Sequence, residues 1–421
     1  MDIFSSYNLI IASSLILIIS FFFGELAKKT NIPSVLMLIV LGMVLKIGLD
    51  SITDTPFDFT SYLEILGIIG LIMIVLEAAL ELKLERDKYV PIAKALGIAF
   101  IGLMVSTWVA AIILNQFIPG MTMQKAWIYG TTISILSSAI IIPSVSRLRP
   151  DKKEFHIYES TFSDILGIMV FYFLVAPFEN GGQESDLVSF GGSLIATIVL
   201  SLIASYLILI IFQRIQTHVK LFLLIAVLLL LYAVGKKMHL SSLIIILIFG
   251  LLISNIKLFF RGTMSQFLDK KQAHDIYEGL HVLTMESAFV VRTFFFVVFG
   301  LTIPLASLAN LKVALISLLI LASIYVIRFV ILRMFIGKDI FPQLYIAPRG
   351  LITVLLFYAI PETAQVPGFE TGILLYIIIG SSVVMTFAMI QNKRRKMSAI
   401  KSAKDNPVNY VKWKAPTVSE S

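Results

Sequence analysis

The segment IYESTFSDILGIMVFYFLVAPF occupies residues 157–178 of the chain. It is apolar and long enough to cross the ~30 Å hydrocarbon core of a bilayer as one α-helix. It nevertheless holds two acids, Glu159 and, near its middle, Asp164. An ionised carboxylate at the bilayer centre costs at least ~2.5 kcal/mol, so a membrane helix that keeps one generally uses it to bind a cation or a proton. Asp164 is therefore the first candidate for an ion-binding residue.

The composition extends this interpretation to the whole chain. Hydrophobic residues make up 58% of the 421, the mean hydropathy is +0.93, and apolar runs of about 20 residues recur from end to end. These features predict an all-α polytopic membrane protein. The first run, residues 6–24, has neither a basic start nor a small-residue cleavage site, so a retained helix is expected. The absence of cysteine excludes disulfides, thiolate metal sites and cysteine nucleophiles.

Apolar runs bounded by charge, proline or glycine predict thirteen spans. Their ranges are 6–24, 32–50, 62–82, 91–115, 126–146, 157–178, 190–213, 217–235, 239–256, 284–305, 311–335, 341–360 and 370–390. Lysine and arginine concentrate in alternate loops and in the segment after residue 391, while the other loops carry only four: Lys125, Lys236, Lys237 and Lys312. The positive-inside rule then predicts an outside N-terminus and a cytoplasmic C-terminus.

The same charge pattern accounts for the net charge of +8 without any nucleic-acid partner. We expect one transmembrane domain, residues 1–392, and a short basic tail, residues 393–421, that is disordered and solvated. Attraction of its basic residues to anionic membrane lipid is the alternative. The loop 257–280 mixes charged and apolar positions, which predicts a short interfacial helix. No cofactor is expected. The cell inner (plasma) membrane is the expected location, because the chain is compact and no targeting peptide is evident.

The ionisable residues expected to be buried inside the predicted spans are few: Glu77, Glu159, Asp164, Arg292, Arg328 and Arg349, with Glu286 near a helix end. Isolated charges in hydrocarbon are unfavourable, so these residues are expected to pair or to face water. On a helix, Glu159 and Asp164 lie about 140° apart, which allows one acid to hold an arginine while the other faces a cavity. The five histidines fall in loops or at helix ends, where a solvated role is expected.

Two predicted spans, the fifth and the twelfth, are interrupted at matching places. The fifth contains Ser137-Ser138-Ala139 and then Pro143, and the twelfth contains Ala347-Pro348-Arg349-Gly350. Proline frees a backbone carbonyl, and irregular backbone at that depth is tolerated around a cavity or inside packed protein. Interruptions at corresponding positions of two halves predict inverted repeats whose two broken helices cross at a transport site. Arg349 is placed to offset the negative half-helix C-termini near the crossing.

The order and spacing of the motifs resemble the monovalent cation/proton antiporter superfamily over nearly all of residues 1–392. The motifs are Ile32-Pro33-Ser34-Val35 with Leu41-Gly42, Leu76 to Glu81, Glu159-Ser160 with Ser163-Asp164, Leu240-Ser241-Ser242 with Gly250 and Asn255, Phe294 to Gly300, Arg328, and Pro348-Arg349-Gly350. The sequence is similar to the sodium/proton exchanger type, with some features of potassium-efflux antiporters.

The resemblance implies a role for each candidate residue. Asp164 would bind the monovalent cation and the proton in turn, with Ser163 beside it, and Glu159 would form a structural ion pair with Arg328. Glu77 would lie near the ion site. Hydroxyls of Ser137 and Ser138 are candidate cation ligands. A single carboxylate at this position resembles the electroneutral branch, and members of this superfamily are commonly homodimers.

Two departures from the family pattern leave alternatives open. Many relatives carry Thr-Asp-Pro where this chain has Ser137-Ser138-Ala139, which is closer to the potassium-efflux relatives. Arg292 stands where some exchangers have an acid, and it would repel a cation unless Glu286 or Glu77 pairs with it. The expected function is exchange of H⁺ for Na⁺, or for K⁺ or Li⁺, by alternating access. The alternatives are a K⁺/H⁺ antiporter or K⁺ efflux protein, and a non-transporting sensor or scaffold. An enzyme is not expected, because the chain has no His-Glu-x-x-His motif.

Overall fold

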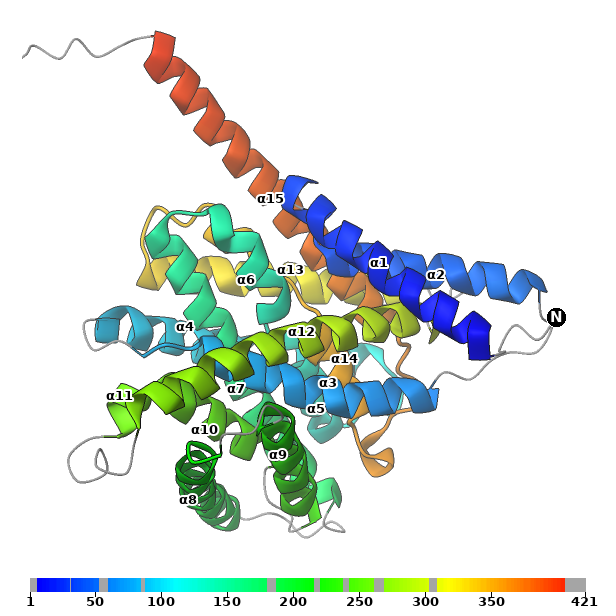
Figure 1. The fold of residues 1–421 in the computed structure, drawn as a ribbon. Helices are drawn as coiled ribbons and strands as arrows, with labels where there is room; N and C mark the ends of the chain where they lie inside the picture. The colour runs from blue at the N-terminus through cyan, green and yellow to red at the C-terminus, as the bar shows by residue number, and fades with distance from the viewer. Residues whose placement is uncertain are drawn as a thin grey trace, which may run out of the picture.

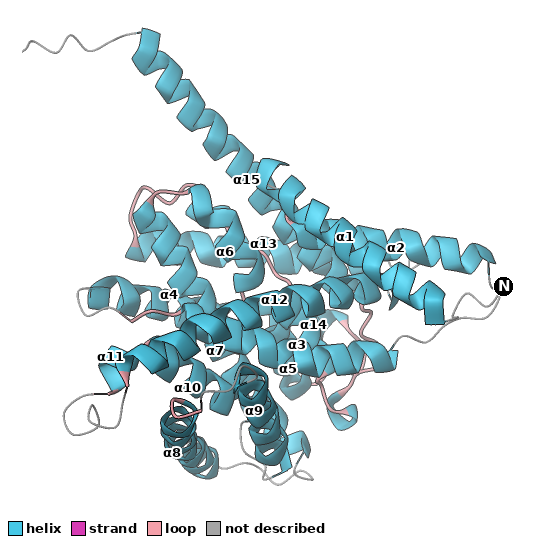
Figure 2. Ribbon diagram, viewed as in Figure 1, coloured by secondary structure: helices cyan, strands magenta, loops and turns pink. Residues whose placement is uncertain are grey.

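The computed structural model describes residues 6–30, 32–52, 60–84, 88–179, 187–215, 220–237, 242–260, 269–302 and 309–405. Within these ranges the regular secondary structure is helical, with no strand (Figure 2). The α-helices are α1 (Ser6–Thr30), α2 (Ser34–Ile52), α3 (Thr60–Glu81), α4 (Tyr89–Phe117), α5 (Met123–Ser134), α6 (Ser138–Ser144), α7 (Pro150–Glu179), α8 (Leu187–Phe212), α9 (Lys220–Lys237), α10 (Ser242–Ser254), α11 (Ile256–Phe259), α12 (Lys270–Thr302), α13 (Leu311–Phe335), α14 (Leu351–Tyr358) and α15 (Gly372–Asp405).

Among the described residues, nine helical segments are long and apolar enough to cross a membrane, and α9 and α10 are shorter apolar helices. The predicted all-α, multi-pass membrane fold is therefore confirmed. The count of thirteen spans and the inverted-repeat relation between two halves stay predictions.

The centre of the bundle is formed by helices that are apolar on every side. In α3, for example, all residues from Leu71 to Leu76 are buried, as expected for a helix surrounded by other helices. It packs against α12 and α10, while α4 packs against α5, α7 and α13. In contrast, α1 and α8 expose large apolar side chains along their lengths, which suits contact with lipid. Figure 1 shows α8 and α9 at one edge of the bundle and the end of α15 projecting away from it.

Helices α2 and α12 approach each other at two glycines, Gly42 and Gly300. A Cβ atom placed on Gly42 would collide with the carbonyl oxygen of Val297 and lie 2.9 Å from the Cα of Gly300. A Cβ on Gly300 would in turn lie 2.9 Å from the Cα of Gly42. The two backbones are therefore in direct contact, as small residues permit between membrane helices.

Two segments differ from the sequence-based expectation. In the loop 257–280, for which a short interfacial helix was predicted, residues 270–280 instead form the first turns of α12, which runs without a break from Lys270 to Thr302. Residues 261–268 of this loop lie outside the described residues. The last helix, α15, continues to Asp405 and so includes residues 393–405, which the sequence assigned to the tail. The remainder of that tail, residues 406–421, lies outside the described residues.

Candidate functional site

The fifth predicted span contains a non-helical stretch, residues 135–137, between the end of α5 at Ser134 and the start of α6 at Ser138. Its backbone amides find partners elsewhere in the protein. The N–H of Leu136 donates to the hydroxyl oxygen of Ser163 (3.0 Å), and the N–H of Ser137 donates to the carbonyl oxygen of Pro348 (3.0 Å). These bonds remove the cost of unpaired backbone at membrane depth.

The bond to Pro348 brings the second irregular segment, residues 346–350, against the first. This segment is non-helical and leads into α14 at Leu351. A Cβ atom on Gly350 would lie only 2.6 Å from the hydroxyl oxygen of Ser137. A side chain at position 350 would therefore force the side chains of Ser137 and Ile140 to shift. The two stretches that the sequence marked as irregular are in contact.

The contact between residues 135–137 and residues 346–350 is called the crossing below. Asp164 lies on α7 beside this crossing and is 2% exposed. The hydroxyl and amide groups of Ser138, at the start of α6, face its carboxylate. Neither carboxylate oxygen, however, has a partner at hydrogen-bonding geometry among the described residues. A buried carboxylate without such partners is unfavourable unless it is protonated or holds a cation. This arrangement is suited to a group that exchanges small positive ligands.

Arg349 is 2% exposed and ties the crossing together with three hydrogen bonds. Its Nε donates to the carbonyl oxygen of Ile133 in the last turn of α5 (2.8 Å), and its Nη1 donates to the carbonyl of Ala347 (3.0 Å). Its backbone N–H donates to the hydroxyl of Ser381 on α15 (3.0 Å). A carbonyl at a helix C-terminus carries partial negative charge and has no intrahelical partner. The guanidinium supplies both a donor and a compensating charge there.

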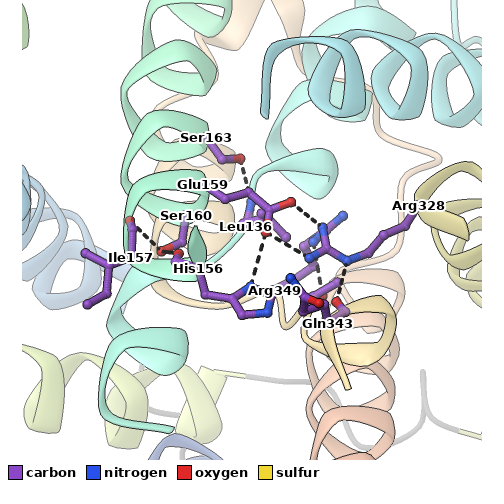
Figure 3. A network of polar contacts seen from close by, with 10 residues as sticks. Leu136, His156, Ile157, Glu159, Ser160, Ser163, Arg328, Gln343 and Arg349 are labelled. Atoms are coloured by element: carbon purple, nitrogen blue, oxygen red, sulfur yellow. Dashed lines mark hydrogen bonds and ion pairs between the residues drawn. The ribbon is translucent and has the colours of Figure 1, made fainter. Parts of the chain in front are cut away.

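Glu159, one and a half turns before Asp164, forms a bidentate ion pair with Arg328 of α13 (Figure 3). The two Nη atoms of Arg328 lie 2.7 and 2.9 Å from the two carboxylate oxygens, and its Nε donates to the carbonyl of Gln343 (3.1 Å). Glu159 is 1% exposed. The pairing expected from the sequence is thus present in the geometry, and it leaves Glu159 committed to the α7–α13 contact.

Behind this pair lies His156, which sequence reasoning assigned wrongly. A solvated role was expected, but the side chain is fully buried, with its Nδ1 3.2 Å from Oε2 of Glu159. The spacing is i, i+3, so the two side chains share one face of α7. That spacing is the signal by which the contact could have been found. The second ring nitrogen, Nε2, has no partner among the described residues.

A second ion pair lies close to the start of α6. Arg292 of α12 contacts both carboxylate oxygens of Glu77 on α3, at 3.2 and 3.0 Å. Its Nη1 also donates to the carbonyl of Ala139 (3.4 Å), the residue after Ser138. Both side chains keep some exposure, 19% for Arg292 and 17% for Glu77. Of the two partners left open for Arg292, the structure selects Glu77 and not Glu286.

The structure therefore brings most of the candidate residues to one region. Ser138 faces Asp164, while Ser137 and Ser163 hold the irregular backbone in place. A cavity of about 30 Å³, lined in part by Glu159, Ser163 and Arg349, lies beside them. This volume is sufficient for a water molecule. Sequence reasoning did not identify Gln343 and Ser381, which serve the network through a backbone carbonyl and a hydroxyl and carry no distinctive motif.

A bundle of apolar helices with a buried carboxylate beside two irregular segments in contact is typical of membrane transporters of small cations. Residues 13–391 match the family described as sodium/hydrogen exchanger, transmembrane, and the chain belongs to this family of cation/proton antiporters.

Two similar solved structures are of the sodium proton antiporter MjNhaP1 from Methanocaldococcus jannaschii. One, determined at pH 8, has a TM-score of 0.67 and 21% identity, and the match covers 93% of this chain and 99% of that chain. The other, an electron-microscopy structure, has a TM-score of 0.65 and 18% identity, with coverage of 98% and 100%. At these identities the likeness concerns the fold. The comparison with curated protein sequences gave no match.

Proposed function

We propose that the protein exchanges H⁺ for Na⁺ at Asp164. The supporting observation is the state of this side chain: it is buried, and neither carboxylate oxygen has a hydrogen-bond partner among the described residues. The other buried acid of α7, Glu159, is occupied by Arg328. Of the two buried carboxylates described on this helix, Asp164 is therefore the one that remains available to a ligand.

The coupling follows from competition at one carboxylate. Desolvation favours the protonated acid, whereas a bound cation favours the ionised form, so the proton and the cation replace each other. If the site opens to one side of the membrane at a time, the transport of each Na⁺ in one direction is coupled to the transport of one H⁺ in the other direction. The exchange would then be electroneutral. The hydroxyl of Ser138 and backbone carbonyls of the crossing are the proposed additional ligands, as oxygen atoms suit a hard cation.

Proton flux in proteoliposomes tests the proposal. Purified wild type and Asp164→Asn are reconstituted with a pH-sensitive dye and given pulses of Na⁺, K⁺ or Li⁺. We expect Na⁺ to drive proton movement in the wild type and none in the variant. The matched control is Asp151→Asn, which changes an exposed carboxylate on the same helix, paired with Arg149, and should transport normally.

The outcomes separate the alternatives. A response to K⁺ without a response to Na⁺ would identify a K⁺/H⁺ antiporter. Retained coupled flux in Asp164→Asn would contradict the assignment of the site. A folded wild type that responds to no cation between pH 6 and 9 would favour a non-transporting sensor or scaffold, and the Ser137-Ser138-Ala139 sequence would then be the first feature to examine.

Assembly and placement are proposed on other grounds. The basic residues in alternate loops support a cytoplasmic C-terminus in a multi-pass protein of the cell inner membrane. The homodimer rests on the family resemblance. Crosslinking in native membranes, followed by a mass measurement, tests it directly.

A further inference from the structure

A second, larger cavity, of about 670 Å³, lies away from Asp164, between the end of α3, helix α11 and the first turns of α12. This is the size range of small-molecule sites. The buried side chains of Asn255, Phe260 and Tyr277 form part of its wall. None of the candidate transport residues lines it. The site is therefore separate from the proposed exchange chemistry.

The charged groups around this cavity are mostly basic. Lys83, Lys257 and Lys271 line it with exposed side chains, together with His274. One acid, Glu278, also lines it, with a carboxylate oxygen 4.0 Å from Nε2 of His274. With the histidine neutral, the described residues of the lining carry three positive charges and one negative charge. Such a surplus in a concave site favours an anion of one or two charges.

Internal bonds hold the cavity in shape. The side chain of Asn255 donates to the carbonyl of Leu82 (2.8 Å) and accepts from the N–H of Leu84 (2.6 Å), which fixes the backbone on both sides of Lys83. The hydroxyl of Tyr277 donates to the carbonyl of Leu80 (3.3 Å), and Lys83 lies over the Tyr277 ring with its Nζ 5.6 Å from the centroid. The lysine is thus positioned by α3, α11 and α12 together.

The position of the cavity along α12 indicates that the anion belongs to a membrane lipid, because the cavity lies near one end of this long helix. This helix has 33 residues and is about 50 Å long, whereas about 20 residues suffice for the hydrocarbon core. Counting back from Thr302, we expect its first dozen or so residues to lie at the level of the lipid headgroups. Lys271, His274 and Glu278 are on these turns.

The face of α12 that carries these groups becomes apolar as it enters the membrane. At 100° per residue, Lys271, His274, Glu278, Val282 and Met285 fall within one stripe about 80° wide. Val282 is 52% exposed and Met285 is 42% exposed. If the bound anion is the headgroup of a lipid, the acyl chains of that lipid would therefore lie against this apolar surface of α12. We propose that this cavity binds the phosphate headgroup of an anionic membrane lipid.

Native mass spectrometry of the full-length protein in detergent tests the proposal. The protein is titrated with phosphatidylglycerol and, separately, with phosphatidylcholine of the same acyl chains. We expect selective retention of phosphatidylglycerol by the wild type, and at least tenfold weaker binding by the variant Lys83→Gln/Lys257→Gln/Lys271→Gln. The matched control, Lys94→Gln/Lys153→Gln/Lys338→Gln, removes the same charge outside the cavity and should bind like the wild type.

Two further measurements make the result decisive. Melting without added lipid should be the same for the wild type and both variants, because the three cavity lysines are exposed. Inorganic phosphate and glycerophosphoglycerol should compete poorly, because they lack acyl chains. Equal lipid binding by the cavity variant, or binding of inorganic phosphate as tight as that of the lipid, would overturn the proposal. Transport is not a readout in these assays, so their outcome is independent of the proposed exchange function.

Discussion

Each arginine near the crossing has a specific set of acceptors. Arg328 holds Glu159, Arg292 holds Glu77, and Arg349 is satisfied by carbonyl oxygens. Among the described buried acids, Asp164 differs from Glu159 because no arginine pairs with it and its oxygens have no partner at hydrogen-bonding geometry. Charged side chains in a low-dielectric interior are retained at a considerable energetic cost. The contrast therefore distinguishes residues that hold the helices together from one that is available for ligands.

The Glu159–Arg328 pair should contribute strongly to stability. We expect Glu159→Gln to lower the free energy of unfolding by about 3–5 kcal/mol, because it leaves the buried Arg328 without its counter-charge. Thermal melting of the purified protein measures the effect. The exposed pair Arg149–Asp151 is the control, and Asp151→Asn should leave the melting temperature nearly unchanged. An equally small change in Glu159→Gln would contradict the structural role of the buried pair.

The Glu77–Arg292 pair should protect cation binding from a nearby positive charge. In Glu77→Gln, Arg292 remains bonded to the carbonyl of Ala139, next to Ser138, without its counter-ion. We expect the KM for Na⁺ to rise about tenfold, which corresponds to about 1.4 kcal/mol. Initial rates of Na⁺-driven proton flux give this value.

The double variant Glu77→Gln/Arg292→Gln separates two explanations. Recovery of the wild-type KM would mean that Glu77 acts by neutralising Arg292. A KM that stays high would mean that Glu77 contacts the cation itself, as the family resemblance allows. An unchanged KM in the single variant would contradict both.

Sequence reasoning at the residue level succeeded where a charge had few possible partners. The acids and arginines inside spans were expected to pair or to face water, and the structure has Glu159 with Arg328 and Glu77 with Arg292. It failed at His156, because the sequence shows which residues share a helix face but not what packs against that face. The burial of His156 depends on helices such as α4 and α5 that pack against α7, and a single helix face does not reveal them.

At the level of the helices, the packing at the crossing requires a small residue on α7, Gly167, opposite the bulky side chain of Ile135. A Cβ on Gly167 of α7 would collide with side-chain atoms of Ile135, which lies in the non-helical stretch. We expect Gly167→Ala to destabilise the protein by about 1–3 kcal/mol through overpacking and to reduce transport. Melting temperature and proton flux, measured together, test this prediction.

Because the obstructing atoms belong to a side chain, Ile135→Ala in the same protein should recover part of both losses. Gly102→Ala on α4 is the control, since its Cβ would meet its nearest neighbour, Cδ1 of Ile331, at an ordinary 3.9 Å. Normal melting and transport in Gly167→Ala would show that the stretch tolerates displacement.

Proline and serine positions predicted where irregular backbone would occur, but not which atoms would satisfy it. The hydrogen bond from Ser137 to Pro348 joins residues that are more than 200 positions apart, so no local pattern could indicate it. The length of α12 was also missed. Charged residues in its first turns were interpreted as a separate interfacial helix, whereas a long helix can extend beyond the hydrocarbon with its polar face in water.

For the whole molecule, the absence of cysteine offers a direct test of orientation. We expect Gln124→Cys, before the crossing, to react with a membrane-impermeant maleimide in intact cells. Lys338→Cys, after α13, should react only once the membrane is permeabilised. Both positions are exposed, and the unmodified chain is the blank. The opposite pattern would reverse the predicted topology.

The multi-pass class follows from composition alone, because no other class accommodates so many long apolar runs. The number of spans is less determined. The apolar runs in the sequence predict spans at 217–235 and 239–256, whereas the corresponding helices α9 and α10 are shorter apolar helices in the structure. Their exact relation to the membrane depends on tilt and on their neighbours, which are properties of the assembled bundle and not of any one segment.

The contact between Gly42 and Gly300 has a consequence for how this protein can change over generations. At Gly167 the obstacle to a larger residue is a side chain, so a second substitution can remove it. At Gly42 and Gly300 the obstacles are main-chain atoms, which every amino acid possesses. No substitution on the opposite helix can make room, so a lineage that loses either glycine can restore the close approach of α2 and α12 only by reversion.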